Sequence, residues 1–273
     1  MKNKYTGNFT KAAASGNDFV IIDNRDGRLD QDKLDYSEIA GDLCRRRHSV
    51  GADGLLVLEA SKKGDFRMRI INPDGSEVDM CGNGARCSAL YAAESGWGND
   101  LVFETGAGIL EAKVVSGNVK IKMSDPKDIQ MDINLGIGAS VLKVHYLNTG
   151  VPHVVHIVND LDGYDVRGIG RQIREHSLFA PAGTNADFVG DIIGGKASIR
   201  TYERGVEDET LACGTGTVAS AVVLGILEYA ASPVKMKTRS GDVLAVHFDI
   251  SGDKVTNVYL EGTASLVYSG TIQ

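Results

Sequence analysis

The sequence predicts an α+β protein made of two pseudo-symmetric domains that arose by internal duplication. The first observation is a repeated segment: MCGNGARCSALYAA, starting at residue 80, aligns with ACGTGTVASAVVLG, starting at residue 212. Shorter matches keep nearly the same offset, among them an Ala-Asp pair that ends at Asp53 and again at Asp187. Strand-like alternation and helical periodicity also follow one another in the same order in both halves. One repeat of about half the chain indicates two facing domains with an active site in the cleft between them.

The predicted elements follow the same order in each half. Short strands are predicted at 19–23, 54–58 and 68–71, and then at 154–158, 187–189 and 198–202. An amphipathic helix is predicted at 36–47 and again at 166–175. A second helix follows the repeated cysteine, at 85–94 and at 217–229. The turn residues around Ser124 and Pro126 place the boundary between a first domain, 1–127, and a second domain, 128–263.

Composition excludes several classes of protein. The 29 basic and 36 acidic residues give a net charge of -7, and the longest basic block is 45–47, so nucleic acid is not an expected partner. The first residues lack the apolar core of a signal peptide, and the most apolar stretch, 217–231, is too short to span a bilayer. The 4 cysteines form no CxxC pair, which favours free thiols in a reducing compartment. We therefore expect a cytoplasmic protein that acts on a small molecule and does not bind membranes.

Each repeated cysteine stands in a C-G-x-G motif directly before an alanine-rich helix. Cys81 and Cys213 are then expected at helix N-termini, where unpaired N–H groups and the macrodipole favour a thiolate with a lowered pKa. The next two backbone N–H groups can converge on one carboxylate. These residues are Gly82 and Asn83 in the first copy, and Gly214 and Thr215 in the second. Two acid/base groups on opposite faces of a carbon invert a stereocentre, so the pair predicts a racemase or epimerase without metal or cofactor.

Other interpretations of the same residues exist. A single C-G-x-G is also typical of a simple turn with a small buried cysteine. A cysteine hydrolase would pair Cys81 with His153, but this leaves Cys213 and the duplication unexplained. His153 and His156 offer a metal site without the usual spacing. Residues 190–196 fail to match a phosphate-binding loop at Ala197. Cys44 and Cys87 lack the motif and are predicted to be core residues.

Several segments resemble the diaminopimelate epimerases in order and spacing, through almost the whole chain. They are GNDF (16–19), GADG (51–54), NPDGSEVDMCGNGARC (72–87), GVPH (150–153), GTNADFV (183–189) and ERGVEDETLACGTGT (203–217). The combination of CGNGARC with ERG before the second cysteine is specific to this branch of the pyridoxal-independent racemases. The resemblance implies interconversion of LL- and meso-diaminopimelate, a step toward lysine and peptidoglycan, by a homodimer without cofactor. It also implies that a C-terminal strand, 264–273, returns to the first domain.

The resemblance assigns roles by position. Cys81 and Cys213 match the catalytic pair. The residues matching those that hold the reacting end of the substrate are Gly82, Asn83, Gly214 and Thr215. Those matching the site of the distal amino acid centre are Asn17, Asn72, Asn185, Glu203 and Arg204. His153 and Glu203 are similar to residues that tune the cysteine pKa values.

Two positions depart from the family pattern. Val151 stands where many members have an asparagine, and Gly54 where some have a glutamine. Both positions would touch the distal end of the substrate, so they bear on specificity more than on the type of reaction. Two further hypotheses therefore stay open: a related racemase of another amino acid, and an amino acid binding protein.

Overall fold

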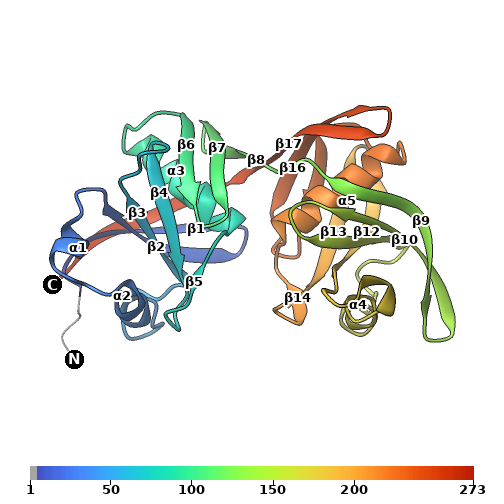
Figure 1. Cartoon of the computed structure of the whole chain (residues 1–273), viewed down its shortest axis with the longest axis horizontal. Helices are drawn as coiled ribbons and strands as arrows, with labels where there is room; N and C mark the ends of the chain where they lie inside the picture. Colours follow the sequence, from blue (N-terminus) through green and yellow to red (C-terminus); the bar gives the residue numbers. More distant parts are fainter. Residues whose placement is uncertain (1–4) are drawn as a thin grey trace. The chain divides into compact units, whose positions relative to one another are not determined.

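The computed structural model describes residues 5–273, which divide into two compact units (Figure 1). The first unit runs to Ile121 and also contains Gly262–Gln273. The second unit is Lys122–Glu261. Each unit has its own buried core, and each is described by itself.

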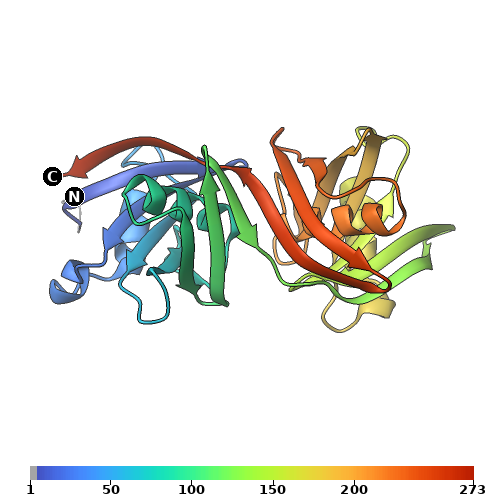
Figure 2. The same ribbon diagram turned by 90° about the horizontal axis from the view of Figure 1, so that it is seen from above.

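The first unit is a mixed sheet with a helix enclosed by it. Its strands are β1 (Gly7–Ala14), β2 (Asn17–Asn24), β3 (Gly54–Glu59), β4 (Phe66–Ile71), β5 (Glu77–Val78), β6 (Asp100–Thr105), β7 (Gly108–Val115), β8 (Asn118–Lys122) and β18 (Ser265–Ile272). Its helices are α1 (Arg28–Gln31), α2 (Tyr36–Leu43) and α3 (Gly82–Glu94). The last strand, β18, pairs antiparallel with β1, and Figure 2 shows this C-terminal strand in red beside the blue N-terminal strand.

The second unit is built from a similar set of strands and helices. Its strands are β9 (Lys127–Ile137), β10 (Ser140–Asn148), β11 (Pro152–Ile157), β12 (Asn185–Ile193), β13 (Lys196–Glu203), β14 (Asp208–Thr210), β15 (Val234–Lys237), β16 (Val243–Ser251) and β17 (Lys254–Thr263). Its helices are α4 (Val166–Arg174), the 3-10 turn η1 (Ser177–Phe179) and α5 (Gly214–Ile226).

The pairing pattern of the two units is the same, strand for strand. In the first unit the order β18-β1-β2-β3-β4-β6-β7-β8 is antiparallel except for the parallel pairs β2·β3 and β4·β6. In the second unit the order β9-β10-β11-β12-β13-β15-β16-β17 is antiparallel except for β11·β12 and β13·β15. The predicted α+β fold with an internal duplication is therefore confirmed.

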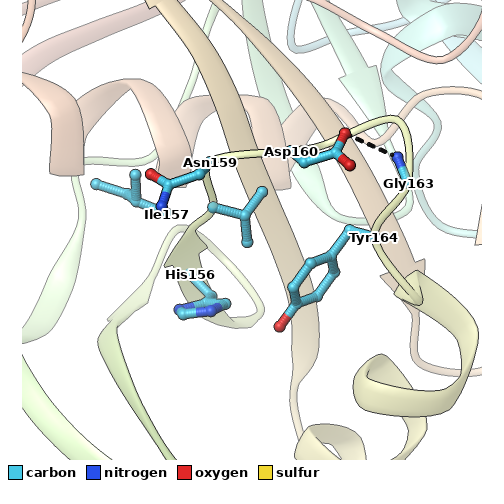
Figure 3. Close-up of a pocket in the computed structure, with 7 residues that line it drawn as sticks. His156, Ile157, Asn159, Asp160, Gly163 and Tyr164 are labelled. Atoms are coloured by element: carbon cyan, nitrogen blue, oxygen red, sulfur yellow. Dashed lines mark hydrogen bonds between the residues drawn. The ribbon is translucent and has the colours of Figure 1, made fainter.

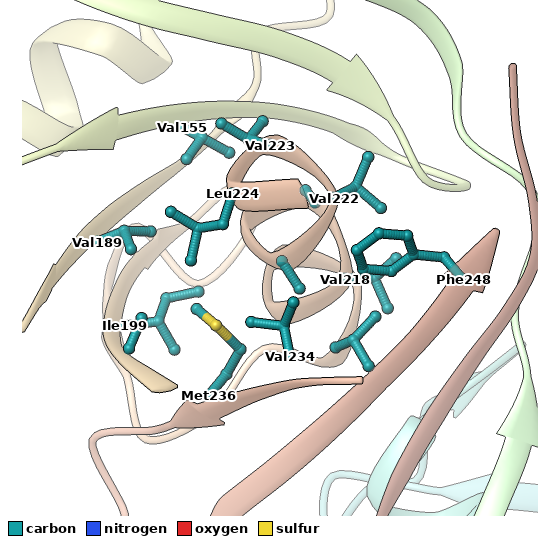
Figure 4. Packing of buried hydrophobic residues seen from close by; sticks show 14 of the residues in the cluster. Val155, Val189, Ile199, Val218, Val222, Val223, Leu224, Val234, Met236 and Phe248 are labelled. Atoms are coloured by element: carbon teal, nitrogen blue, oxygen red, sulfur yellow. The ribbon is translucent and has the colours of Figure 1, made fainter. Parts of the chain in front are cut away.

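Helix α3 of the first unit and helix α5 of the second unit lie in the cores of their units. Along α5 every residue from Gly216 to Leu224 is buried, and Figure 4 shows Val218, Val222 and Leu224 packed among strand side chains. The surrounding side chains include Val155, Val189, Ile199, Met236 and Phe248. Helix α3 is likewise buried over most of its length. A helix that is apolar or small on all sides must lie inside a fold, so the chemistry at its N-terminus rests on a fixed element.

The helix boundaries differ from the prediction in an informative way. Helices α3 and α5 begin at Gly82 and Gly214, three residues before the predicted starts, because each cysteine is itself the N-cap. Helix α2 ends at Leu43 rather than at residue 47, where Arg47 has a left-handed φ of 68°. Cys44 and Cys87 are buried, as predicted.

Many strands were not predicted from the sequence. Those missed include β1, β6 to β10 and β15 to β17. Several of them carry exposed and buried residues in a broken alternation, as in β17, where register shifts interrupt the pairing with β16. In residues 5–273 no helix combines the length and the apolar character needed to traverse a bilayer.

Candidate active site

The two catalytic candidates occupy the same position in their units. Cys81 and Cys213 are the N-cap residues of α3 and α5, each with extended backbone. The Gly84 N–H donates to Cys81 Sγ at 3.5 Å, and Cys213 Sγ lies 3.5 Å from Thr215 Oγ1. Each sulfur therefore sits at the positive end of a helix, where polar hydrogens stabilise negative charge.

In the first unit a chain of hydrogen bonds starts from a buried arginine. The Arg86 guanidinium, which is 0% exposed, donates to Asn83 Oδ1 at 2.7 Å and to Ser15 Oγ at 2.8 Å. Asn83 Nδ2 then donates to Asn17 Oδ1 at 2.7 Å. Asn17 Nδ2 donates in turn to Asp53 Oδ2 at 3.2 Å. Because arginine only donates and a carboxylate only accepts, the two ends fix the orientation of both amides between them.

A cluster of charged side chains connects the segment that carries Asn17 to the segment that carries Asp53. Arg46 bonds both Asp18 and Asp53, and the buried Lys11 bonds Asp18 and the Gly51 carbonyl oxygen. Although burial alone would raise it, hydrogen bonds from Arg46 and Lys11 lower the pKa of Asp18 to about 2. The GNDF and GADG segments are thus fastened to each other, which holds Asn17 at the start of β2.

In the second unit the corresponding chain contains a histidine. His153, 0% exposed at the start of β11, lies with Nδ1 2.7 Å from Asp187 Oδ2 and Nε2 2.9 Å from Thr215 Oγ1. Thr201 donates its hydroxyl to the other Asp187 oxygen at 2.7 Å. The contacts therefore connect Asp187, His153, Thr215 and Cys213 in one series.

The remaining candidates of the second unit adjoin this series. Asn185 Oδ1 accepts the Arg204 N–H at 2.8 Å, and Asn185 Nδ2 lies 3.4 Å from His153 Nε2. Burial raises the pKa of Glu203, and the Glu203 carboxylate in turn raises the pKa of Cys213. The Arg204 side chain donates to the Ala182 carbonyl oxygen at 3.0 Å. The structure thus brings together His153, Asn185, Glu203, Arg204, Cys213 and Thr215.

The lowered thiol pKa expected from the helix N-terminus is wrong for Cys213. Burial raises the pKa of this thiol to about 12, and the Glu203 and Asp187 carboxylates raise it further. The Thr215 hydroxyl and the Gly216 N–H act in the opposite direction but do not prevail. Burial dominates because the free energy lost when a thiolate is removed from water exceeds the free energy gained from one helix N-terminus.

Asn72 and the first glycines of the helices have simpler settings. Asn72 follows β4 and donates from Nδ2 to Ser76 Oγ at 3.0 Å, which closes the turn before β5. A Cβ added at Gly82 would meet no atom within 4 Å, so the space beside this residue on the Cβ side is open. At Gly214 the same Cβ would lie 3.2 Å from Leu260.

Five residues of these hydrogen-bond chains were not among the sequence candidates: Ser15, Asp53, Arg86, Asp187 and Thr201. A signal existed for the two aspartates, because each ends the Ala-Asp pair that recurs in both halves. The internal repeat gave no signal for Arg86, because the aligned residue in the second copy is Val218.

The histidine pair considered for metal binding does not share a site. His153 and His156 are three residues apart on β11, so their side chains leave opposite faces of the strand. His156 bonds the Lys143 carbonyl oxygen and lines a separate pocket of about 420 Å³ with Tyr164 and Asp160 (Figure 3). Among residues 5–273, no three His, Cys, Asp or Glu side chains are grouped to hold a metal ion.

Comparison with known proteins gives the family. A family model described as diaminopimelate epimerase matches residues 9–129 and 145–267. The chain belongs to the diaminopimelate epimerase family. The diaminopimelate epimerase of Hydrogenobaculum sp. (strain Y04AAS1) is 43% identical over 274 residues, with 96% of this chain and 97% of that protein covered. The diaminopimelate epimerase of Chlorobaculum tepidum is 42% identical, with 95% and 99% covered.

Solved structures that resemble this member of the diaminopimelate epimerase family share its fold at low identity. A phenazine biosynthesis protein of the PhzF family from Bacillus anthracis matches with a TM-score of 0.69 and 19% identity, over 98% of this chain and 99% of that one. A hydroxyproline epimerase from Agrobacterium vitis matches with a TM-score of 0.63 and 15% identity, over 100% and 92%.

Proposed function

We propose that this chain is a diaminopimelate epimerase that interconverts LL-2,6-diaminopimelate and meso-diaminopimelate with Cys81 and Cys213 as its two acid/base groups. The observation that carries the proposal is the matched position of the two thiols. Each caps the central helix of one unit, and the two units have one strand pairing pattern. Family membership adds the substrate named for the relatives.

The proposed reaction needs one thiolate and one thiol. The thiolate removes the α-proton from one face of the carbon and becomes a thiol. The other thiol gives its proton to the opposite face and becomes a thiolate, so atoms and charge balance. The negative charge that develops on the α-carboxylate is stabilised by backbone N–H groups after each cysteine. Because the pKa of Cys213 is raised to about 12, we assign Cys213 the thiol role in the resting enzyme.

The distal end of the substrate is proposed to bind the residues of the ERG and GTNAD segments, together with Asn17 and Asn72. A zwitterionic centre needs a carboxylate for its ammonium group and a guanidinium for its carboxylate, which Glu203 and Arg204 supply. Asn185 positions Arg204, because its Oδ1 accepts the Arg204 backbone N–H at 2.8 Å.

The test is α-hydrogen exchange in deuterated water. We expect Cys81→Ala and Cys213→Ala each to abolish inversion, since each removes the acid/base group from one face. Cys44→Ala and Cys87→Ala are matched controls, because both thiols are buried in cores. These two variants should lose stability but keep their turnover. Normal inversion by either active-site variant would refute the two-thiol mechanism.

Oxidation tests whether the two thiols act on one carbon. Thiols that grip opposite faces of a single carbon should form a disulfide in the empty enzyme when a disulfide oxidant such as diamide takes up the two electrons and two protons. We expect a Cys81–Cys213 crosslink that tracks loss of activity, is slowed by diaminopimelate and is reversed by dithiothreitol. Inactivation with both thiols still free would contradict the proposal.

A second candidate is a related racemase of another amino acid, which is favoured by Val151 at a position where the family pattern has an asparagine. A panel of amino acids in the exchange assay separates the candidates. Exchange of diaminopimelate alone supports the epimerase, and efficient exchange of an amino acid without a distal centre supports the broader racemase. Tight binding without exchange would indicate an amino acid binding protein.

We also propose a homodimer in the cytoplasm. The dimer rests on the family resemblance, and the location rests on four cysteines that are all free thiols, as suits a reducing compartment. Sedimentation of the purified protein at micromolar concentration tests the dimer, and a monomer with full turnover would exclude it as a requirement. Fractionation of source cells tests the location.

A further inference from the structure

A buried carboxylate that the proposed reaction does not use lies behind the histidine of the second unit. Asp187 is 0% exposed and accepts from His153 and Thr201 at 2.7 Å each. It also lies against the start of α5, where a Cβ added at Gly216 would come within 2.3 Å of Asp187 Oδ1. The last glycine of the second C-G-x-G motif therefore makes room for this carboxylate.

The surroundings of His153 fix which ring nitrogen carries the proton. Asp187 presents only acceptor atoms to Nδ1, so Nδ1 carries the hydrogen. Two groups that can donate face Nε2: the Thr215 hydroxyl at 2.9 Å and the Asn185 amide nitrogen at 3.4 Å. The Arg204 N–H holds the oxygen of that amide, so its nitrogen must point toward the ring. Nε2 therefore carries a lone pair and accepts a hydrogen bond.

The same reasoning gives the direction of the bonds as far as the sulfur. The Thr215 hydroxyl donates its hydrogen to His153 Nε2. The lone pairs of Thr215 Oγ1 therefore face Cys213 Sγ, which lies 3.5 Å away. A thiol at Cys213 then donates to Thr215 Oγ1. The donors run in one direction, from Cys213 through Thr215 to His153, and end at Asp187.

We infer that Asp187, held by Thr201, fixes His153 as the terminal proton acceptor of a relay that runs from the Cys213 thiol through the Thr215 hydroxyl. The Sγ proton moves to Thr215 Oγ1 while the Oγ1 proton moves to His153 Nε2. The products are a Cys213 thiolate and an imidazolium that faces the Asp187 carboxylate. No other bond changes, and the reverse transfer restores the thiol. The inference rests on the proposed function for its purpose, since it lets a buried thiol act as a base.

The first unit provides an internal comparison. There Asp53 holds Asn17, which meets Asn83, the residue two positions after Cys81. An amide cannot take up a proton in the accessible pH range, so this chain positions side chains but relays nothing. Around the relay of the second unit the ionisable groups are Asp187 from β12, Glu203 from β13 and Cys213 before α5.

The decisive variant is Asp187→Asn, which keeps the shape of the side chain. Thr201 continues to donate to the oxygen of the new amide, which turns its nitrogen toward His153 Nδ1 and forces the ring hydrogen onto Nε2. We expect ring ¹⁵N shifts of His153 to report an Nδ1–H tautomer in the native chain and an Nε2–H tautomer in the variant. Inversion should fall on the order of 10²-fold, with a changed pH profile of kcat/KM.

Matched variants separate a relay from a packing effect. Thr215→Ser keeps the hydroxyl and should retain most of the rate, whereas Thr215→Val should lose it and slow alkylation of Cys213. Asp53→Asn should change KM without altering the shape of the pH profile, because the amides of Asn17 and Asn83 stand between this carboxylate and the Cys81 segment and take up no proton. An Nε2–H tautomer in the native chain would overturn the relay, as would equal rates for Thr215→Ser and Thr215→Val.

The tautomer and alkylation measurements need no turnover. If the chain fails to invert diaminopimelate, the proposed function falls, while ring shifts and Cys213 alkylation still decide whether the relay exists. If inversion is normal but the Asp187→Asn variant keeps the native tautomer and the native alkylation rate, the relay alone is refuted.

Discussion

At the scale of single residues, two glycines at equivalent places have different neighbours. Gly216 is the last glycine of its motif, and a Cβ there would lie 2.3 Å from Asp187 Oδ1. Gly84 is its counterpart in the first unit, and a Cβ there would lie 3.1 Å from the tip of Leu56, a flexible side chain. The last glycine of the C-G-x-G motif is therefore required for a different physical reason in each unit.

This difference gives the first prediction. Gly216→Ala should destabilise the chain by about 1–3 kcal/mol, because overpacking displaces a buried carboxylate from its hydrogen bonds. Gly84→Ala should cost less, since Leu56 can move and alanine is the better helix former. Urea unfolding of both variants checks the order, and equal losses would show that Asp187 is not held tightly.

The buried thiols give a second prediction, on alkaline pH. Burial raises the pKa of Cys44 to about 11 and that of Cys87 to about 12, from an ordinary value of 9.0. Above pH 9 the unfolded chain loses thiol protons that the folded chain keeps, so the free energy of unfolding falls as pH rises toward 11. Below pH 9 this contribution is fully present.

Urea midpoints measured between pH 8 and pH 10.5 test this dependence. The Cys87→Ala variant is less stable overall because it leaves a small cavity, but its midpoint should fall less steeply with pH than that of the native chain. Identical slopes would show that the Cys87 thiol ionises as readily in the folded chain as in the unfolded one.

Residues of the candidate site could be predicted from the sequence only where they belong to a recognisable motif. The cysteines, glycines and the ERG segment stand out in one sequence, whereas Arg86 and Thr201 do not. Their importance comes from what they meet in the fold, Asn83 in one case and Asp187 in the other. Contacts of this kind join residues from different strands and helices, and sequence spacing does not encode them.

At the scale of elements, the helices were easier to predict than the strands. The cysteine helices are runs of small and apolar residues with a clear start, and they are found where expected. Their first turns were missed, because Gly82 and Gly214 read as turn residues although glycine is tolerated at the first helical position. The outer strands were missed because an exposed strand is defined by its partner, not by its own pattern.

Helix α4 supports a prediction about capping. Asp165 accepts the Gly168 N–H at 2.9 Å and is the N-cap of a helix whose last turn carries Arg171 and Arg174. Asp165→Ala should lower stability by about 0.5–2 kcal/mol, because it leaves an N–H of the first turn without its acceptor. Asp165→Asn serves as the control, since an amide oxygen still accepts, and thermal unfolding should rank it near the native chain.

At the scale of the whole molecule, the first unit depends on both ends of the chain. Strand β18 covers β1 from Gly7 to Ala13, and Phe9 of β1 packs edge-on against Tyr268 of β18. The only tryptophan, Trp97, lies in this unit between Phe66, Tyr91 and Arg25. Its fluorescence therefore reports on the first unit alone.

Removal of residues 264–273 tests this dependence. We expect the tryptophan transition to move to lower temperature, because the edge of β1 loses its partner, while far-UV circular dichroism retains a second, unshifted transition from the second unit. Removing only the last residue, Gln273, which lies beyond β18, is the control. A tryptophan transition that stays in place after the longer deletion would show that β18 contributes little.

The return of β18 has a consequence for biosynthesis. On the ribosome, β1 is made before the second unit, but its partner strand β18 is made after that unit, roughly 13 to 50 seconds later than β1 at ordinary elongation rates. The second unit, a continuous segment, is finished before then. The unit that is begun first is therefore completed after the other, and the edge of β1 lacks its partner until the second unit has been made. Termination between Glu261 and the start of β18 yields a chain with the whole second unit and a first unit that lacks β18.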